Sequence, residues 1–273
     1  MSDPIDDLHE RAKTIREEMG GAQRVERMRA DGKPTIRGHI DALLDAGSFR
    51  ELGTFSRSIR HEDRANTPGD GKIGGDGLID GRPVAVVGDD ITVKRGSSAI
   101  VGSRKTSRLF KRAVEMGMPY VYFGETGGGR IPDLIGAEGI ADAVPSPDIA
   151  RRRREIPMAS VIVGQSFGGS SFQSAFSDFT VQVRGSVLAV TSPRVFEIAI
   201  GEIISFEELG GIDVHAKTTG QIDLGVDTYE EAYEAVRRWL SFLPSNAHQV
   251  APRGEAMAAE RWQPDQRLAD FVP

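Results

Sequence analysis

Two stretches of the chain decide its fold: PYVYFGETGGGR at residues 119–130 and MASVIVGQSFGGS at residues 158–170. Each begins as a short apolar run, at residues 119–123 and 158–163, and ends in a glycine-rich turn, and a run of small residues follows the second turn. Short apolar runs that end in turn signals are typical of buried strands. Because strand, turn and helix alternate at least twice, the sequence predicts an α/β fold for the centre of the chain.

The segments on either side continue this alternation. Two strands joined by a hairpin at residues 79–81 are predicted within residues 48–97, because apolar runs flank an Asp-Gly pair. The other predicted elements are helices at residues 98–116, in part of 131–155, and at 170–177, 193–200 and 227–242, with strands at 179–183 and 187–191.

The chain is predicted to have three parts. Residues 1–35 form an N-terminal helical extension, residues 36–246 the central domain, and residues 247–273 a C-terminal arm. The extension contains a polar amphipathic helix over residues 4–30, which a pair of glycines interrupts. The arm loses periodicity, so it is expected to lie on a partner or to be mobile.

Composition limits the classes of function. The chain has 273 residues and no cysteine, which excludes disulfide scaffolds, cysteine nucleophiles and thiolate metal sites. No run approaches the roughly 18 apolar residues of a membrane span, and the first residues lack a signal-peptide pattern, so a cytoplasmic, non-membrane protein is expected. A net charge of -6 argues against nucleic-acid binding. Basic clusters at residues 94–112 and 151–154 favour a small anionic ligand instead.

Three common site patterns are weak in this sequence. Residues 69–74 fit G-x-G-x-x-G, but a predicted hairpin follows them where a dinucleotide site needs a helix. The five histidines lack metal-ligand spacing, so no metal site is predicted. Residues 164–168 fit G-x-S-x-G with Ser166 as nucleophile, which leaves a serine hydrolase as a minor alternative. The histidines downstream of this motif are His215 and His248.

The two glycine-rich turns are the strongest functional signal. Glycine lets the backbone approach a ligand closely and adopt positive φ. A backbone N–H group at such a turn can stabilise developing negative charge, and one donor lowers a barrier by roughly 2.7–4 kcal/mol. Two turns side by side would form an oxyanion hole. The alternative is that the glycines only permit tight packing of strand against helix, but the repeated design favours the functional interpretation.

Beyond these motifs, the chain resembles the N-terminal half of a biotin-dependent acyl-CoA carboxylase carboxyltransferase (β) subunit of the propionyl-CoA and acetyl-CoA carboxylase type. The resemblance spans residues 36–246 and is carried by HIDALLDAGSFRELGTF, GDGLIDGRPVAVVGDDITVKRGSS, RKTSRLFKRAVEMGMPYVYFGETGGGRI, the run from SVIVGQSFGGSS to TTGQIDL, and LSFLPSN. It implies the crotonase (ClpP-like) fold, in which stacked short-stranded sheets carry flanking helices.

The resemblance also assigns roles to individual residues. The first turn matches the family's Ser-Gly-Gly-Ala-Arg, which implies that the Gly127 and Gly128 amides hold the thioester oxygen as acyl-CoA becomes an enolate. Gly168 and Gly169, in the turn that matches Gly-Pro-Cys-Ala-Gly-Gly, are assigned to catalysis with them. Substrate contacts are assigned to Gly129, Arg130, Lys105 and Phe167.

Some of these positions carry open questions. Gln165 and Phe167 depart from the family's pattern, which changes the wall of the acyl pocket. Lys105 is expected to approach the CoA phosphates or adenine, with a role on the solvated surface as the alternative. Glu125, next to the first turn, would suit a crotonase-type hydratase, but nothing in the sequence pairs with it.

The implied reaction moves a carboxyl group from carboxybiotin to the α-carbon of an acyl-CoA. Biotin would be carried by a separate protein, the CoA thioester is the substrate, and no metal is implied in this chain. A full subunit of the family has a second crotonase-like half, so a separate chain is expected to supply the C-terminal half. Biotin carboxyl carrier protein and biotin carboxylase are further implied partners, in a hetero-oligomer.

Two other functions remain open at the level of sequence. The chain would also suit the β subunit of a biotin-independent malonate-type decarboxylase, which has a similar length. It would also suit a non-catalytic module of a carboxylase complex. The β chain of bacterial acetyl-CoA carboxylase carries a four-cysteine zinc ribbon, which this cysteine-free chain lacks. Neither the acyl group nor the partner chain is fixed by the sequence.

Overall fold

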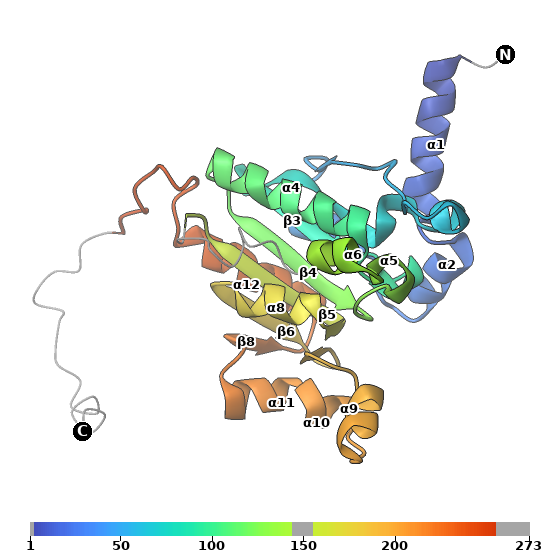
Figure 1. The fold of residues 1–273 in the computed structure, drawn as a ribbon. Helices are drawn as coiled ribbons and strands as arrows, with labels where there is room; N and C mark the ends of the chain where they lie inside the picture. Colours follow the sequence, from blue (N-terminus) through green and yellow to red (C-terminus); the bar gives the residue numbers. More distant parts are fainter. Residues whose placement is uncertain (1–2, 144–154, 255–273) are drawn as a thin grey trace, which may run out of the picture.

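The computed structural model describes residues 3–143 and 155–254 of the chain. Its strands have the bounds β1 Arg50–Glu51, β2 Lys72–Ile79, β3 Arg82–Asp89, β4 Tyr120–Thr126, β5 Met158–Phe167, β6 Phe179–Val183, β7 Val187–Ala189 and β8 Leu224–Val226. Within the described residues they form one sheet of order β1-β2-β3-β4-β5-β6-β8, and β7 pairs with β5 off this path. The predicted α/β fold is confirmed: a mixed sheet carries helices on its faces (Figure 1).

The strands pair antiparallel at one edge of the sheet and parallel through its centre. β2 and β3 form the predicted hairpin, in which Asp80 and Gly81 both have positive φ, 50° and 75°. Positive φ at both central residues defines a type I′ turn, which an Asp-Gly pair favours. From β3 to β6 each neighbouring pair is parallel. Because parallel strands run in the same direction, the segments that follow β3, β4 and β5 meet beyond the carboxyl ends of these strands.

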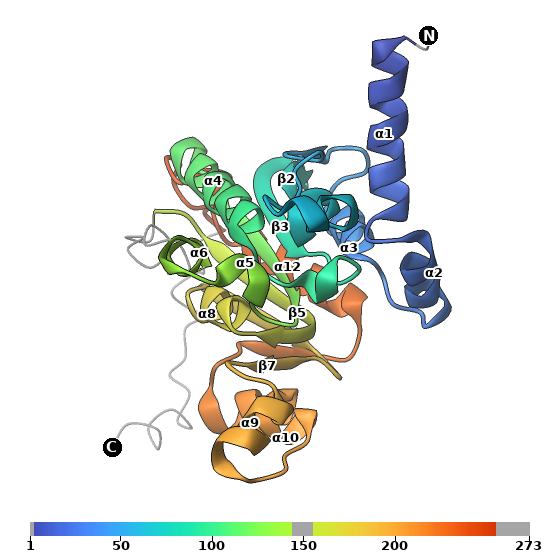
Figure 2. The ribbon, with the colours of Figure 1, turned by 45° about the vertical axis from the view of Figure 1, so that its right-hand side comes forward.

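Helices cover both faces of the sheet. The helices α4 (Ile100–Met116) and α8 (Gly169–Ala175) contact one face, and α12 (Tyr229–Ser241) packs with α3 (Ile36–Leu43) on the other (Figures 1 and 2). The remaining helical elements are α1 Pro4–Glu18, α2 Ala22–Ala30, α5 Ile131–Leu134, α6 Ala137–Ala143, α9 Pro193–Ile200, α10 Phe206–Gly210 and α11 Ile212–Val214, with shorter turns at His61–Asn66, Pro68–Gly71, Lys94–Gly96 and His215–Thr219.

Each face buries its own apolar cluster. Side chains alternate across a strand, so a central strand contributes to both clusters. In β4, Tyr120 and Tyr122 belong to the cluster under α4 together with Phe110, whereas Val121 and Phe123 belong to the cluster under α3 and α12. Because burial of one large apolar side chain stabilises a fold by about 1.5–3 kcal/mol, this strand is held firmly on both sides.

The strand β5 is longer than the one predicted at residues 158–163, and it changes partner along its length. Its residues 159–162 pair with β6, and its residues 165–167 pair with β7. The change occurs around Gly164. The Glu125 side chain occupies the space where a β-carbon on Gly164 would lie, because an added Cβ would lie 2.2 Å from Oε1 of Glu125. The strand therefore runs on into the second glycine turn.

The helix predicted over residues 4–30 is in fact two helices, α1 and α2, separated at Gly20 and Gly21. Gly20 packs directly on the backbone of Thr92, where an added Cβ would lie 2.1 Å from the carbonyl oxygen. Its amide donates to Thr92 Oγ1 at 2.9 Å. The helix α1 stands away from the sheet (Figures 1 and 2), so the extension is anchored at the glycine pair.

The helices α9, α10 and α11 form a separate group beyond β7 and β8 (Figures 1 and 2). No residue of α9 is buried, although Val195 and Ile198 are apolar. Residues 144–154 and 255–273 lie outside the described residues, and with them the basic run at 151–154 and most of the predicted C-terminal arm. None of the described helices has the length and apolar character required to cross a membrane.

Candidate active site

The structure brings the two glycine-rich turns together. They follow β4 and β5, which are adjacent parallel strands with Thr126 paired to Ser166. An added Cβ on Gly168 would lie 3.8 Å from the Cα of Gly128, so the turns touch. Both glycines have positive φ, 102° at Gly128 and 63° at Gly168, a conformation that favours glycine. The space on the Cβ side of Gly128 is open, with no heavy atom of the described chain within 4 Å.

Three of the amides assigned to catalysis have acceptors within the chain. The Gly127 amide donates to the Arg95 carbonyl at 2.9 Å, and the Gly168 amide donates to the Val190 carbonyl at 3.1 Å. The Gly128 amide donates to Thr126 Oγ1 at 3.1 Å. In the described conformation these hydrogen bonds fix the shape of the turns, and the three N–H groups are not free for a ligand.

One amide in each turn has no such acceptor. The amides of Gly129 and Gly169 make no hydrogen bond to the part of the chain that the structure describes. Gly169 opens α8, and the first N–H groups of a helix lack partners inside the helix. Gly129 is exposed and Gly169 is half-buried, so both are accessible. The geometry therefore offers one free donor in each turn, at Gly129 and Gly169.

Arg130 is buried, and its side chain supports the first turn through hydrogen bonds to neighbouring segments. Its guanidinium donates to Asp70 Oδ1 at 2.6 Å and to the Ser97 carbonyl at 3.2 Å, and its side chain is 6% exposed. Its amide donates to the Ser98 carbonyl at 2.8 Å. In this structure Arg130 thus holds the turn against the Pro68–Gly71 and Lys94–Gly96 turns, and its assigned contact with substrate stays a prediction.

A buried chain of hydrogen bonds supports the second turn. Lys72 pairs with Asp89, and the Tyr122 hydroxyl lies 2.6 Å both from Asp89 Oδ2 and from Ser170 Oγ. Ser170 Oγ lies 2.5 Å from Ser166 Oγ. Burial, followed by the charge of Asp89, holds the pKa of Tyr122 well above its usual value. The network links β2, β3 and β4 to the first turn of α8.

Ser166 does not have the setting of a hydrolase nucleophile. Its side chain is fully buried and its hydroxyl is bonded to Ser170. The His215 ring nitrogens lie 2.7 Å from the Leu188 carbonyl and 2.9 Å from Thr219 Oγ1. The geometry therefore assigns Ser166 to the support of the turn and gives no Ser–His pair with His215.

The two residues that depart from the family's pattern have different surroundings. Phe167 is 5% exposed and stacks on Phe206 of α10, with ring centroids 6.4 Å apart. Gln165 is half-buried, and its Oε1 accepts a hydrogen bond from the Arg95 guanidinium at 3.2 Å. Phe167 as part of an acyl-pocket wall remains a prediction, whereas Gln165 contacts a residue that the sequence did not single out.

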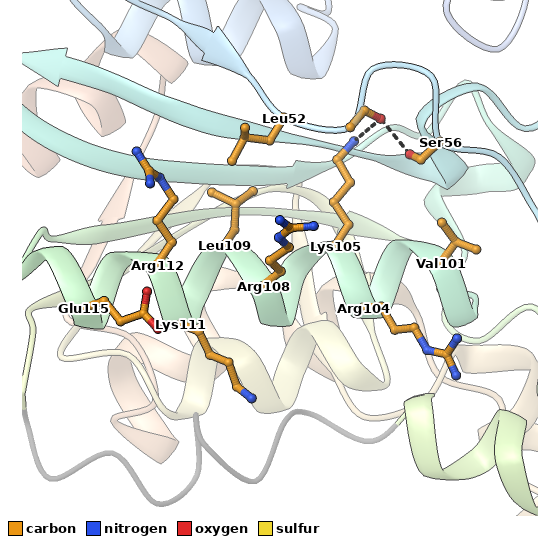
Figure 3. A pocket seen from close by; sticks show the side chains of 11 residues that line it. Leu52, Ser56, Val101, Arg104, Lys105, Arg108, Leu109, Lys111, Arg112 and Glu115 are labelled. Carbon is orange, nitrogen blue, oxygen red and sulfur yellow. Dashed lines mark hydrogen bonds between the residues drawn. The ribbon is translucent and has the colours of Figure 1, made fainter.

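Lys105 lines a positively charged cavity on α4 (Figure 3). Its ammonium donates to the Lys72 carbonyl at 2.7 Å and to the Gly53 carbonyl at 3.3 Å, and burial lowers its pKa to about 8. In Figure 3, Lys105 and Arg112 point from α4 toward the strands. The cavity has a volume of ≈ 700 Å³ and contains the cationic side chains of Arg104, Lys105, Arg108, Lys111 and Arg112.

Glu125 lies at the start of the first turn with its carboxyl group against Gly164. Burial raises its pKa to about 7, and the carboxylates of Asp89 and Asp90 act in the same direction, against Lys33. The hydratase alternative would need a second carboxylate that shares the site. Among the described residues, no hydrogen bond joins the Glu125 side chain to another carboxylate. No group of three metal-ligating carboxylates or histidines occurs among these residues either.

The sequence and the fold place the chain in a known class. Residues 27–273 match the carboxyl transferase domain family, and the chain belongs to that family. It is 36% identical over 281 residues to the propionyl-CoA carboxylase, carboxyltransferase subunit of Haloferax mediterranei, covering 99% of this chain and 52% of that one. The chain also matches the crystal structure of transcarboxylase 12S with methylmalonyl-coenzyme A and methylmalonic acid bound. The match covers 100% of this chain and 54% of the transcarboxylase chain, with a TM-score of 0.84 and 29% identity.

The chain spans about half the length of these relatives. A third match has a more similar length: a chain of a Pseudomonas malonate decarboxylase hetero-tetramer in complex with malonate. It covers 76% of this chain and 81% of its own, with a TM-score of 0.66 and 27% identity. The predicted resemblance to a carboxyltransferase N-terminal half is confirmed, and so is the fold that it implied.

Proposed function

We propose that this chain is the acyl-CoA-binding half of a carboxyltransferase that moves a carboxyl group from carboxybiotin to the α-carbon of an acyl-CoA. A separate chain supplies the C-terminal half. The observation that carries the proposal is the contact between the two glycine turns on adjacent strands, Gly128 against Gly168, in a chain of the carboxyl transferase family.

The roles of the turn residues follow from their hydrogen bonds. The free amides of Gly129 and Gly169 donate to the thioester oxygen as the α-carbon loses its proton and negative charge develops. One such donor lowers the barrier by roughly 2.7–4 kcal/mol. Gly127, Gly128 and Gly168 give the turns their shape and leave the space between them open. The thioester is proposed to bind in that open space, and biotin on its carrier protein supplies the carboxyl group.

The cavity on α4 provides the positive charge that a CoA thioester needs. Phosphate groups are bound in proteins chiefly by arginine and lysine side chains. Arg108 lines the cavity and has no ion-pair partner among the described residues, whereas Arg112 is paired with Asp76. Lys105 is already bonded to the backbone carbonyls of Gly53 and Lys72, and it contributes its charge to the cavity from that position.

The proposed partners follow from the chemistry and from the relatives, of whose length this chain spans about half. A second crotonase-like chain completes the site, a biotin carboxyl carrier protein delivers the carboxyl group, and a biotin carboxylase charges the carrier. The proposed assembly is a cytoplasmic hetero-oligomer. Its acyl-CoA is left open, and Gln165 and Phe167 are the positions proposed to shape the acyl pocket.

A second candidate function is the β subunit of a malonate-type decarboxylase. Its support is the structural match to a malonate decarboxylase chain of similar length. In that reaction the same free amides would stabilise the enolate that forms when CO2 leaves a malonyl thioester. The two functions use one site in opposite directions, so biotin is the feature that separates them.

Purification of the tagged chain from its native cells, followed by mass spectrometry and a streptavidin blot, tests the proposal. We expect a second crotonase-like chain and a biotinylated protein, and acyl-CoA-dependent carboxylation by the complex. A second chain without any biotinylated protein would favour the decarboxylase. The chain purified alone, with no acyl-CoA turnover in any fraction, would contradict both and favour a non-catalytic module.

A further inference from the structure

Arg95 lies across the two glycine turns. Its carbonyl accepts the Gly127 amide, and its Cβ and Nε would both lie 3.5 Å from a β-carbon on Gly127. Its guanidinium then reaches Gln165, which precedes the second turn, with Nη2 3.2 Å from Oε1. One side chain therefore joins the first turn to the end of the strand that leads into the second turn.

The Arg95 guanidinium has no anionic partner in the described chain. Among residues 3–143 and 155–254 it takes part in no ion pair, and its side-chain hydrogen bond goes to the neutral amide of Gln165. Arg95 is exposed, so its charge faces the solvent in front of the turns. An unpaired cation at this place attracts anions to the site.

The pair of Arg95 and Gln165 presents mainly hydrogen-bond donors. Guanidinium has five N–H donors and no acceptor, and a primary amide has one oxygen and two N–H donors. Because Gln165 Oε1 accepts from Arg95, the Nε2 group of Gln165 is available as a donor. A group that only accepts hydrogen bonds and carries negative charge fits this arrangement, and an ionised carboxylate has both properties.

The backbone at Arg95 is held in a conformation that side chains rarely adopt. Lys94 and Arg95 have φ of 48° and 60°, in the left-handed region. Non-glycine residues remain there when the surrounding structure requires it, and such residues gather at functional sites. The two side chains separate: Lys94 turns away to Asp63, with Nζ 3.0 Å from Oδ1.

We infer that Arg95 and Gln165 form a carboxylate receptor at the acyl end of the site, and that they select the carboxylated acyl-CoA over its uncarboxylated counterpart. A malonyl-type thioester carries its carboxylate on the α-carbon, next to the thioester oxygen that the turns hold. The inference rests on the proposed acyl-CoA site and adds a preference for one of its two thioesters.

Calorimetric titration of the full-length chain with propionyl-CoA and with methylmalonyl-CoA tests this inference. Charge-assisted hydrogen bonds support an expectation of roughly tenfold tighter binding of methylmalonyl-CoA by the wild-type chain. Arg95→Gly suits the left-handed backbone, so the variant is expected to fold. It should remove the preference and leave the affinity for propionyl-CoA within about twofold. Gln165→Glu should remove the preference too, because its carboxylate would neutralise Arg95.

Lys94→Gly is the matched control, because it removes one positive charge at the adjacent left-handed residue. It should keep the preference. Equal affinities in the wild-type chain, a preference that survives Arg95→Gly, or an equal loss in Lys94→Gly would each overturn the receptor. Failure of both thioesters to bind the chain and its purified complex would instead overturn the proposed acyl-CoA site, and the receptor with it.

Discussion

The carboxyl group of Glu125 lies against the α-carbon of Gly164 on the neighbouring strand, where a β-carbon would come within 2.2 Å of Oε1. This contact forms at the point where β5 leaves β6 and pairs with β7. It brings a titratable group to the base of the first turn, in surroundings that exclude water. The contact has consequences for both pH dependence and packing.

Glu125 should make the stability of the chain depend on pH. Its pKa rises from 4.5 to about 7 on folding, chiefly because of burial. The folded state therefore binds the proton more tightly than the unfolded state, and stability falls as pH rises from about 4.5 to about 7. Above that window the ionised carboxylate costs about 3 kcal/mol. Urea unfolding of the wild type and Glu125→Gln at pH 5, 6 and 8 measures this, since the variant lacks the step. Parallel pH profiles would contradict it.

A β-carbon at Gly128 should block the site without unfolding the protein. The space on that side is open, so a methyl group there occupies the gap between the turns and not the core. In Gly128→Ala we expect acyl-CoA turnover by the complex to fall by about 10²–10³-fold, the typical effect of losing an oxyanion contact. Steady-state kinetics of the purified complex checks this.

Gly81→Ala is the control for backbone strain in that experiment. Gly81 also has positive φ, 75°, and open space around its β-carbon position. It precedes β3, however, and so lies at the end of the strands opposite to the two glycine turns. Each variant should lose about 1–2 kcal/mol of stability from the left-handed backbone. Full activity in Gly128→Ala would remove the turn from the mechanism, and equal losses in both variants would point to strain alone.

Two tyrosines on β4 offer a matched pair for the buried network. Tyr122→Phe removes the hydroxyl that bonds Asp89 and Ser170, and leaves a buried carboxylate with one partner fewer, which should cost about 1–3 kcal/mol. The Tyr120 hydroxyl is buried without a partner in the described chain, so Tyr120→Phe should leave stability unchanged or raise it. Denaturant midpoints distinguish the two, and equal effects would argue against the network.

Substitution of Arg130 should lower the stability of the chain more than it changes substrate binding. Breaking the buried pair with Asp70 leaves an unpaired carboxylate in the interior, so Arg130→Met should cost about 3–5 kcal/mol. Arg130→Met combined with Asp70→Asn should recover part of that loss, because it removes the Asp70 charge but leaves the buried carboxylate of Asp133, whose Oδ1 lies 3.9 Å from Nη1 of Arg130. Unfolding of both variants tests this. A stable Arg130→Met chain with a raised KM for acyl-CoA would return Arg130 to the substrate contacts.

The sequence revealed the parts of the fold that depend on residues close to one another in the sequence. The Asp-Gly hairpin depends on local chemistry, so the turn before β3 was predicted closely. The strand that leads to the first turn was predicted at residues 119–123 and ends three residues later, at Thr126. β5 was predicted too short, because its extension past Gly164 depends on a side chain of another strand, Glu125. Pairing between β5 and β7 has no local signature.

The candidate site was predicted in part for the same reason. Glycine repetition pointed to both turns, and the family resemblance assigned their amides, but which N–H groups stay free depends on acceptors such as Arg95 and Val190. The contact of Arg95 with Gln165 joins residues 70 positions apart and carries no pattern in the sequence. The predicted domain boundaries at residues 35 and 246 stay predictions.

The double pairing of β5 limits how the chain can change in length. Removal of one residue between its two halves would turn every following side chain to the other face, so Ser166 would leave Ser170 and Phe167 would take its place. An insertion there would do the same. Surface turns such as the one at Gly185, with open space around it, have no such limit. Length variation among relatives of this chain should therefore be absent from β5 and frequent in the turns at the sheet's edges.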